Sequence, residues 1–277
     1  METDLNEHTH QQDLNQTPAI GDSNEELELE QQSAQIREAI YSFLSAVYLQ
    51  PITEDTLKQI CDNLFLNDLA EVLPSEATTE LRRYLSELSS EDLTDAVTRL
   101  KQEFMSLFAV PTGRYVTPFE DIYRGKNSDG QPHRGPLLGV RAIAVKQIYR
   151  EAGAEIDSVT KELPNHIGVE LSFMRFLCER EAAALIDGDV IEQGTGQNID
   201  DDIGENEDTN IFTQVEIYRA YQIRFLAEHL TRWFPELNEE IQKKSNHVFY
   251  QSIANITQQF LEQDLQILKT QLSNSVQ

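Results

Sequence analysis

The sequence predicts an all-α fold, a multi-helix bundle of about nine or ten helices. Apolar residues recur at helical spacing in most of the segments between breaks. No segment shows the sustained alternation of apolar and polar residues that is typical of strands, and no β-α-β rhythm or internal repeat is present. Helices of this kind bury their apolar stripes against one another, so a bundle around a shared core is expected.

Four helices are expected in the first part of the chain, and each has a start or stop signal in the sequence. They are 33–51, ended by Pro51; 53–65, with Thr53 as N-cap; 75–88; and 89–108, where Ser89 and Asp92 have the spacing of a capping box. The segment 109–135 follows them and is rich in Gly, Pro and aromatic residues. A break of this length inside a compact domain is often functional.

Four further helices are expected after this break. They are 136–153, with Gly153 at its C-terminal cap; one that starts after Pro164 and runs to Gly188; 210–235, ended by Pro235; and 245–269. The helix that follows Pro164 is apolar on two faces, which predicts a central, buried position. We expect Asn165 to be its N-cap, and His166 to be neutral because the positive end of the helix dipole disfavours imidazolium.

The net charge of −26 is concentrated in two segments. Residues 1–40 hold ten acidic residues and one arginine, and residues 187–208 hold nine acidic residues and no Lys or Arg. Both indicate disorder. The predicted organisation is an acidic tail over 1–32, an N-terminal helical part over 33–160 that contains the loop 109–135, and a C-terminal helical part over 161–277 that contains an acidic loop over 188–209.

Composition excludes several classes of function. The chain has no basic stripe to replace counterions on phosphate, so nucleic acid is not an expected partner. Cys61 and Cys178 are far apart and form no CxxC motif, which favours a reduced compartment, the cytoplasm. Neither a signal peptide nor an apolar run long enough to cross a bilayer is visible.

Local motifs for cofactors and metals are also missing. "RGKNSDG" lacks the Ser/Thr of a phosphate loop, "NIDDDIGENED" lacks the ligand spacing of a calcium loop, and no Glu-x-x-His or GxSxG is present. We therefore expect no cofactor and no metal. A small helical enzyme acting on nucleotide or cofactor near His166 remains an alternative, because catalytic groups can converge from distant positions.

Seven stretches in a fixed order carry a resemblance to a known family. They are "YSFLSAVYLQP", "EFMSLFAVP", "TPFEDIYRG", "VRAIAVKQIYREAGAEI", "ELPNHIGVELSFMRFL", "FLAEHLTRWFPEL" and "FYQSIANIT". Across residues 36–268 the chain resembles the TorD/DmsD/NarJ family of chaperones for molybdenum oxidoreductases. The resemblance implies an all-helical protein of two parts joined by a hinge, either a monomer or a domain-swapped homodimer.

The resemblance also implies a function. Such proteins are not enzymes; they bind the twin-arginine signal peptide and the apo catalytic subunit, and hold back export until the molybdopterin guanine dinucleotide cofactor is inserted. The expected client serves anaerobic respiration and is a formate dehydrogenase or a terminal reductase, with a slight preference for the former. Weak guanine nucleotide binding is known of some relatives and is allowed here. A NarJ-like chaperone for a non-exported subunit, or a helical adaptor, are the alternatives.

Client-binding residues are carried over from the family's motifs. The aromatic-x-x-Leu-Phe segment corresponds to Phe104, Leu107 and Phe108, the Pro-aromatic-Glu-x-x-Tyr turn to Pro118, Phe119, Glu120 and Tyr123, and the Asp-His pair to Asn165 and His166. Asn165 replaces the family's Asp and so loses a charge that pairs with a signal-peptide arginine. By proximity and analogy, Glu120, Glu162 or Glu170 is expected to supply the acid instead.

Overall fold

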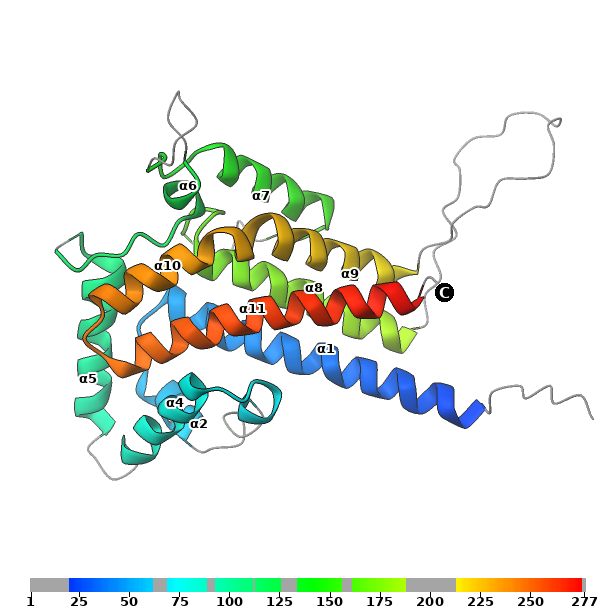
Figure 1. The fold of residues 1–277 in the computed structure, drawn as a ribbon, viewed down its shortest axis with the longest axis horizontal. Coiled ribbons are helices and arrows are strands. Elements are labelled where there is room, and N and C mark those ends of the chain that lie inside the picture. The colour runs from blue at the N-terminus through cyan, green and yellow to red at the C-terminus, as the bar shows by residue number, and fades with distance from the viewer. Residues whose placement is uncertain are drawn as a thin grey trace, which may run out of the picture.

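The computed structural model describes residues 20–61, 69–88, 93–111, 113–125, 134–155, 161–187 and 213–275. These residues form ten α-helices and two π-helical segments and no named strand, which confirms the all-α prediction (Figure 1). The helices are α1 (Ile20–Leu49), α2 (Glu54–Cys61), α4 (Glu76–Leu88), α5 (Leu93–Phe104), α6 (Glu120–Tyr123), α7 (Val140–Glu151), α8 (Ile167–Asp187), α9 (Gln214–Phe225), α10 (Thr231–Lys244) and α11 (Val248–Ser275), and the π-helical segments are η1 (Met105–Ala109) and η3 (Leu226–Leu230).

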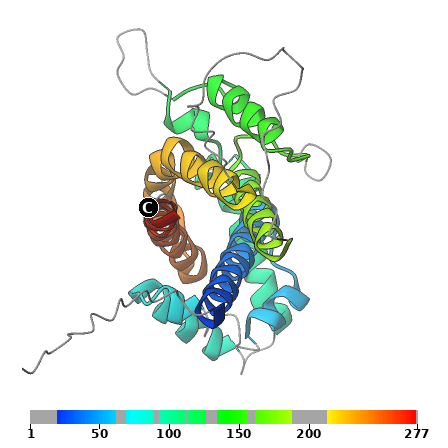
Figure 2. The same cartoon turned by 90° about the vertical axis from the view of Figure 1, so that its right-hand side faces the viewer.

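The helices α1, α8, α9 and α11 run lengthwise through the molecule and form its centre (Figure 1). α8 packs along α1 on one side and against α9 on the other, and α11 packs against α9, α10 and α4. The end-on view places α2 and α4 on the α1 side and α7 on the α9 side (Figure 2). One apolar core takes residues from both predicted parts of the chain. Within the described ranges, no helix is both long and apolar enough to cross a membrane.

The central position predicted for the helix after Pro164 is confirmed. Side chains on opposite faces of α8 are buried, among them Val169, Phe173 and Met174. Gly168 allows the close contact with α1, because a Cβ there would lie 2.5 Å from the Leu49 side chain. α8 is therefore the helix around which the others are arranged.

Several local signals predicted from sequence are also confirmed. The Thr56 backbone N–H donates to the Thr53 hydroxyl, 3.1 Å away, and Gly153 has a φ of +74° just beyond the end of α7. The predicted capping box at Ser89 and Asp92, and the acidic loop 188–209, lie outside the described residues.

The start of the first helix differs from the prediction. α1 begins at Ile20, inside the segment 1–32 that was predicted as a disordered tail. The Glu, Gln and Leu residues that dominate this stretch are strong helix formers as well as markers of polarity. Glu30 also pairs with Arg219 of α9 at 3.1 Å, which ties this part of α1 to the bundle. The disorder prediction is therefore wrong for residues 20–32, and residues 1–19 lie outside the described chain.

The helical end predicted at Pro235 is wrong as well. Pro235 lies inside α10, which begins directly after η3. A proline inside a helix costs about 3 kcal/mol, in part because it removes one backbone hydrogen bond. Trp233, Phe234 and Leu237 are buried around it. Burial of each such side chain contributes roughly 1.5–3 kcal/mol, which is enough to keep the helix continuous.

A buried ionic network joins α1, α8, α9 and α11. The Arg37 guanidinium of α1 pairs with Glu181 of α8 at 3.0 Å and with Asp264 of α11 at 2.6 Å. Arg219 of α9 pairs with Glu181 at 2.6 Å, and the Tyr41 hydroxyl donates to Asp264 at 2.6 Å. Burial alone would raise the pKa of Glu181, but Arg37 and Arg219 outweigh it and lower that pKa. The network fixes how α1, α8, α9 and α11 meet.

Substitution of Arg37 by Met should lower the free energy of unfolding by about 3–5 kcal/mol. The buried carboxyl groups of Glu181 and Asp264 would then lose the cation that pairs with both of them. The matched control is Arg83→Met, since Arg83 pairs with Glu87 on the surface of α4; it should change stability by less than about 0.5 kcal/mol. Urea unfolding at neutral pH measures both. A loss below 1 kcal/mol for Arg37→Met, or equal losses in the two variants, would contradict a structural role for the network.

Candidate functional site

The polar residues of the predicted site meet where the chain segment 116–125 crosses the start of α8. The backbone N–H of Ile167 donates to the carbonyl of Pro118 at 2.9 Å, and the N–H of Glu120 donates to the carbonyl of Asn165 at 3.0 Å. Phe119 and His166 form an isolated antiparallel bridge. We call this region, with the adjoining start of α7 and the segment η3, the junction.

Asp121 connects the junction to α7. Its carboxylate accepts hydrogen bonds from the backbone N–H groups of Gly139, Arg141 and Ala142 at 2.9–3.0 Å. These are unpaired donors at the positive end of α7, where a carboxylate is favoured. A Cβ at Gly139 would lie 2.4 Å from the carboxylate, so glycine is required for this approach.

Asn165 does not cap α8 as predicted. Its side-chain amide donates to Asp121 at 3.0 Å and to the carbonyl of Leu137 at 3.1 Å. His166 is the cap instead, because its Nδ1 accepts the N–H of Gly168 at 3.0 Å. Burial lowers the pKa of His166 to about 4, so the ring is neutral as predicted, with burial rather than the helix dipole as the main cause.

Glu120 is fully buried and contacts the side chains of Arg124 and His229. Its Oε1 is 2.6 Å from Nη1 of Arg124, and its Oε2 is 2.8 Å from Nδ1 of His229 in η3. Nη1 of Arg124 also donates to the backbone carbonyl of Glu228, 2.5 Å away. The side chain of Arg124 is 20% exposed, whereas that of Glu120 is 0% exposed. The ion pair is therefore closed on the glutamate side and open to solvent on the arginine side.

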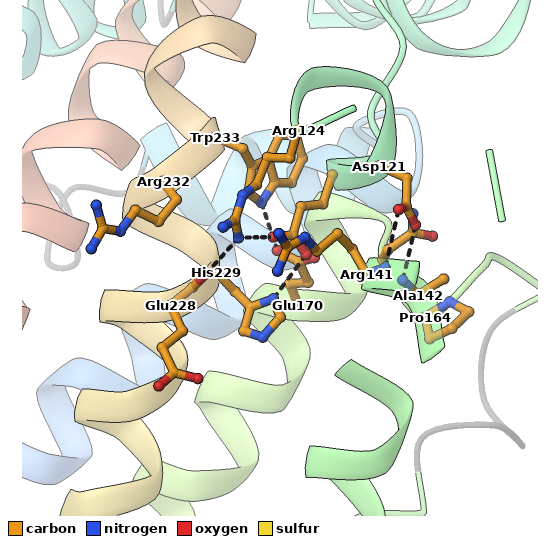
Figure 3. Close-up of polar contacts among 12 residues, drawn as sticks. Asp121, Arg124, Arg141, Ala142, Pro164, Glu170, Glu228, His229, Arg232 and Trp233 are labelled. Carbon is orange, nitrogen blue, oxygen red and sulfur yellow. Dashed lines mark hydrogen bonds and ion pairs between the residues drawn. The ribbon is translucent and has the colours of Figure 1, made fainter. Parts of the chain in front are cut away.

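Glu170, the first acidic residue of α8, completes the cluster. Its Oε2 accepts the indole N–H of Trp233 at 3.0 Å, and its Oε1 has no hydrogen-bond partner among the described residues. Burial, and then the charge of Glu120, raise its pKa well above the usual range, which favours the protonated form of the carboxyl group. Figure 3 shows four side chains that converge: Glu170 from α8, Arg124 from the residue after α6, His229 from η3 and Trp233 from α10.

This arrangement is suited to binding a cation that also donates hydrogen bonds. It offers two buried carboxyl groups and a backbone carbonyl next to the aromatic rings of Trp233 and Tyr123, which stack with centroids 5.6 Å apart. No group of three or more His, Cys, Asp or Glu residues in the described chain could hold a metal ion.

The structure divides the predicted client-binding residues into two groups. Phe119, Glu120, Tyr123, Asn165, His166 and Glu170 belong to the junction. Phe104, Leu107 and Phe108 belong instead to the core around η1, where the Phe108 ring lies 5.8 Å from Tyr48 and 6.0 Å from Tyr250. Apart from Tyr123, the predicted residues are at most 9% exposed, so they do not line an open groove here.

Glu162, the third acid that was considered, lies apart from this cluster. It is exposed and lines a cavity of about 400 Å³ between α1 and α8, together with Lys161 and Arg175.

Four residues of the junction were missed from sequence: Asp121, Arg124, His229 and Trp233. The chain offered two signals for them. Asp121 and Arg124 lie in the quoted stretch "TPFEDIYRG", and His229 and Trp233 lie in "FLAEHLTRWFPEL". His229 is 109 residues from Glu120, so their contact could not be found from local spacing.

Together, the fold and the junction define an all-helical protein whose polar site is closed by its own ion pairs. Among curated proteins, the chaperone protein TorD of Colwellia psychrerythraea is 21% identical over 87% of this chain and 96% of its own length. TorD of Aliivibrio salmonicida is 22% identical over 84% and 94%. The perchlorate reductase assembly chaperone of Dechloromonas aromatica is 24% identical over 62% and 65%.

The sequence model of the nitrate reductase delta subunit family matches residues 70–239, which is more than half of the chain. The chain belongs to this family. This confirms the resemblance to the TorD/DmsD/NarJ chaperones that the sequence motifs indicated. The matched relatives are named as chaperones and assembly proteins, so the protein is classed with chaperones and not with enzymes.

Glu120 and Glu170 should respond differently to the same substitution. Because burial and the charge of Glu120 disfavour the ionised form of Glu170, its replacement by the neutral and similarly shaped Gln should change the free energy of unfolding at pH 7 by less than about 1 kcal/mol. Glu120→Gln removes the charge that pairs with Arg124 and His229 and should lower stability by about 2–3 kcal/mol. Urea unfolding of the two variants measures the difference. Equal losses would contradict the different roles assigned to the two carboxyl groups.

His166 should make the protein sensitive to mild acid. The unfolded state binds a proton below pH 6.5, whereas folded His166 does so only near its pKa of about 4. Stability is therefore lost as the pH falls from 6.5 to 4, by about 2 kcal/mol at pH 5. In His166→Asn, which keeps a capping acceptor, the loss between pH 7 and pH 5 should be smaller by this amount. An NMR midpoint near 6.5 for the His166 ring would contradict the assignment.

Proposed function

We propose that this protein is a cytoplasmic chaperone that binds the twin-arginine signal peptide and the apo catalytic subunit of a molybdenum oxidoreductase. It holds back export until the molybdopterin cofactor is inserted. The observation that carries the proposal is the family match over residues 70–239, which spans segment 116–125, the start of α8 and η3. The names of the TorD relatives and of the perchlorate reductase assembly chaperone support it.

The chemistry of the junction agrees with such a ligand. A twin-arginine peptide has a cationic part and an apolar part, and it needs a receptor with acidic and apolar surfaces. The junction supplies the carboxyl groups of Glu120 and Glu170. Charge would mainly direct the encounter and orient the peptide, and apolar burial would supply most of the affinity.

An exposed apolar surface lies beside the junction. It consists of Leu137, Leu138, Val140 and Ile143, which are 49%, 61%, 74% and 67% exposed. We call these four residues the α7 patch. Clusters of exposed apolar side chains are uncommon on monomeric proteins and often mark binding surfaces. Because Asp121 holds the start of α7, the patch and the buried carboxyl groups are parts of one connected region.

Since most of the junction is buried, binding of a peptide there requires movement of segment 116–125 away from α8 or η3. On the α8 side, the polar contacts that would separate are the two backbone hydrogen bonds to residues 165 and 167 and the bond from Asn165 to Asp121. On the η3 side, they are the contact of Glu120 with His229 and the bond from Arg124 to the carbonyl of Glu228. The client is the catalytic subunit of a formate dehydrogenase or of a terminal reductase.

Affinity capture from anaerobically grown source cells, followed by mass spectrometry, tests this function. Wild-type protein should recover the catalytic subunit of one molybdenum enzyme with its twin-arginine leader intact. The variant Leu138→Ser/Ile143→Ser should recover several-fold less, because it removes apolar area from the α7 patch. The matched control is Ile186→Ser, since Ile186 is 66% exposed at the far end of α8; its recovery should equal that of wild type.

Failure to recover such a subunit from cells that make one would contradict the proposal. Recovery of a subunit that stays in the cytoplasm and carries only a remnant leader would instead favour the NarJ-like form of the function.

A further inference from the structure

We infer that Glu120 and the backbone carbonyl of Glu228 form a guanidinium-binding site, that Arg124 occupies this site in the closed protein, and that an arginine of the client displaces Arg124 on binding. The site and its occupation by Arg124 stand on the geometry of this chain alone. The source of the displacing arginine rests on the proposed function.

The first observation is the coordination of Arg124. One guanidinium nitrogen contacts the carboxylate of Glu120 at 2.6 Å and the carbonyl of Glu228 at 2.5 Å. Both bonds come from Nη1, so a guanidinium in this position still has N–H donors on two further nitrogens for another acceptor, whereas an ammonium group has a single nitrogen. The site is thus already shown to accept an arginine, although that arginine belongs to the protein.

The second observation explains why the carbonyl of Glu228 is available. Glu228 lies in η3, and a π-helical turn disrupts the regular hydrogen bonding of the α-helix. Three successive carbonyls of η3 accept from side chains: Leu226 from the Thr231 hydroxyl at 2.8 Å, Ala227 from Nε of Arg232 at 2.9 Å, and Glu228 from Arg124. Two of these three donors are guanidinium groups. η3 therefore presents carbonyls to arginine side chains.

The third observation concerns access. The carboxyl group of Glu120 is fully buried, whereas the side chain of Arg124 is 20% exposed. Arg124 is therefore the partner that can move out to solvent, and an incoming arginine can reach Glu120 from the same side. α6, which begins at Glu120 and is followed directly by Arg124, is only four residues long.

The fourth observation is an acceptor that Arg124 does not use. Oε1 of Glu170 is buried and has no hydrogen-bond partner in the described chain, and the nearby charges of Glu120 and Arg124 both influence this carboxyl group. A guanidinium that enters more deeply than Arg124 could bond to Glu120 and Glu170 together. This second acceptor gives a client arginine an advantage over the internal one.

Competition with Arg124 has a consequence that a purely structural ion pair would not have. An internal group on a short tether is present at a high effective concentration, so it weakens binding of any external competitor. Removal of Arg124 should therefore strengthen binding of an arginine-containing ligand, although it weakens the fold. A structural ion pair predicts the opposite, because loss of stability would weaken binding.

The first experiment tests the site without any client. The full-length variant Arg124→Ala should melt at a lower temperature than wild type, and millimolar N-ethylguanidinium chloride should restore part of the loss. Ethylammonium chloride at the same concentration should not. Arg83→Ala, which removes the exposed pair with Glu87, is the matched control and should show no rescue. Absence of selective rescue, or equal rescue in the control, would overturn the site.

The second experiment tests displacement. A fluorescent synthetic peptide with an Arg-Arg pair before an apolar segment, and the same peptide with Lys-Lys, are titrated into wild type, Arg124→Ala and Arg124→Ala/Glu120→Gln. Arg124→Ala should bind the Arg-Arg peptide about tenfold more tightly than wild type. The double variant should lose this gain, and the Lys-Lys peptide should show none. If Arg124→Ala does not fold, Arg124→Gln replaces it in both experiments.

The outcomes separate this inference from the proposed function. If wild type binds the Arg-Arg peptide and Arg124→Ala binds it no better, displacement is wrong and the chaperone function stands. If the selective rescue succeeds but no variant binds the peptide, the guanidinium site stands, displacement by such a peptide is wrong, and the proposed function loses its peptide-binding step.

Discussion

The structure depends on one constraint, which is that the start of α8 is buried and its free backbone N–H groups must still be paired. An unpaired buried donor costs about 1–3 kcal/mol. The N–H of Ile167 donates a hydrogen bond to the carbonyl of Pro118, and the N–H of Gly168 donates to Nδ1 of the His166 ring. The first of these partners comes from a distant segment, so the constraint holds 116–125 against α8. At a solvent-exposed helix start, water would have supplied the hydrogen-bond partners of these N–H groups.

Once this segment is held, the carboxylates of Glu120 and Asp121 are forced into the interior, where each needs its own partners. Asp121 accepts hydrogen bonds from N–H groups at the start of α7, and Glu120 contacts the side chains of Arg124 and His229. Two consecutive acidic residues thus connect α8 to α7 and to η3. The polar chemistry of the junction is in this sense a result of how α8 is buried, and it would form in the absence of any client.

The fold was largely predictable because most of its signals are local. Helical periodicity, the Thr53 cap and Gly153 depend on residues a few positions apart, and the apolar faces of α8 showed that it is central. The site was less predictable. Asn165 was expected to cap α8 because its side chain suits that role, but the buried amide is held by Asp121 and the cap passes to His166. Only the assembled fold brings these groups together.

Apolar residues also lie elsewhere than the sequence predicted. The examples are Phe104, Leu107 and Phe108. Their pattern next to a long break suited either a binding groove or a core, and periodicity alone cannot distinguish the two. In the closed structure they are buried in the core around η1, where the Phe108 ring packs against Phe104, Tyr48 and Tyr250. The nearby apolar residues that are exposed lie at the start of α7 instead, in a stretch where the sequence predicted only a helix start.

The ionic network between the central helices and the one at the junction both pair buried carboxylates with arginines. They differ in how far the arginines are buried. Arg37 and Arg219 are both almost fully buried and have partners on several long helices, so neither can leave without separating the bundle. Arg124 has one buried carboxylate, one backbone carbonyl and a path to solvent. Burying a charge is costly in both networks. Only at the junction can an incoming cation replace Arg124 so that the buried carboxylate of Glu120 is not left without a cationic partner. Exchange of one arginine for another avoids that penalty, and this explains how a buried acidic site can open for a ligand and still be stable when empty.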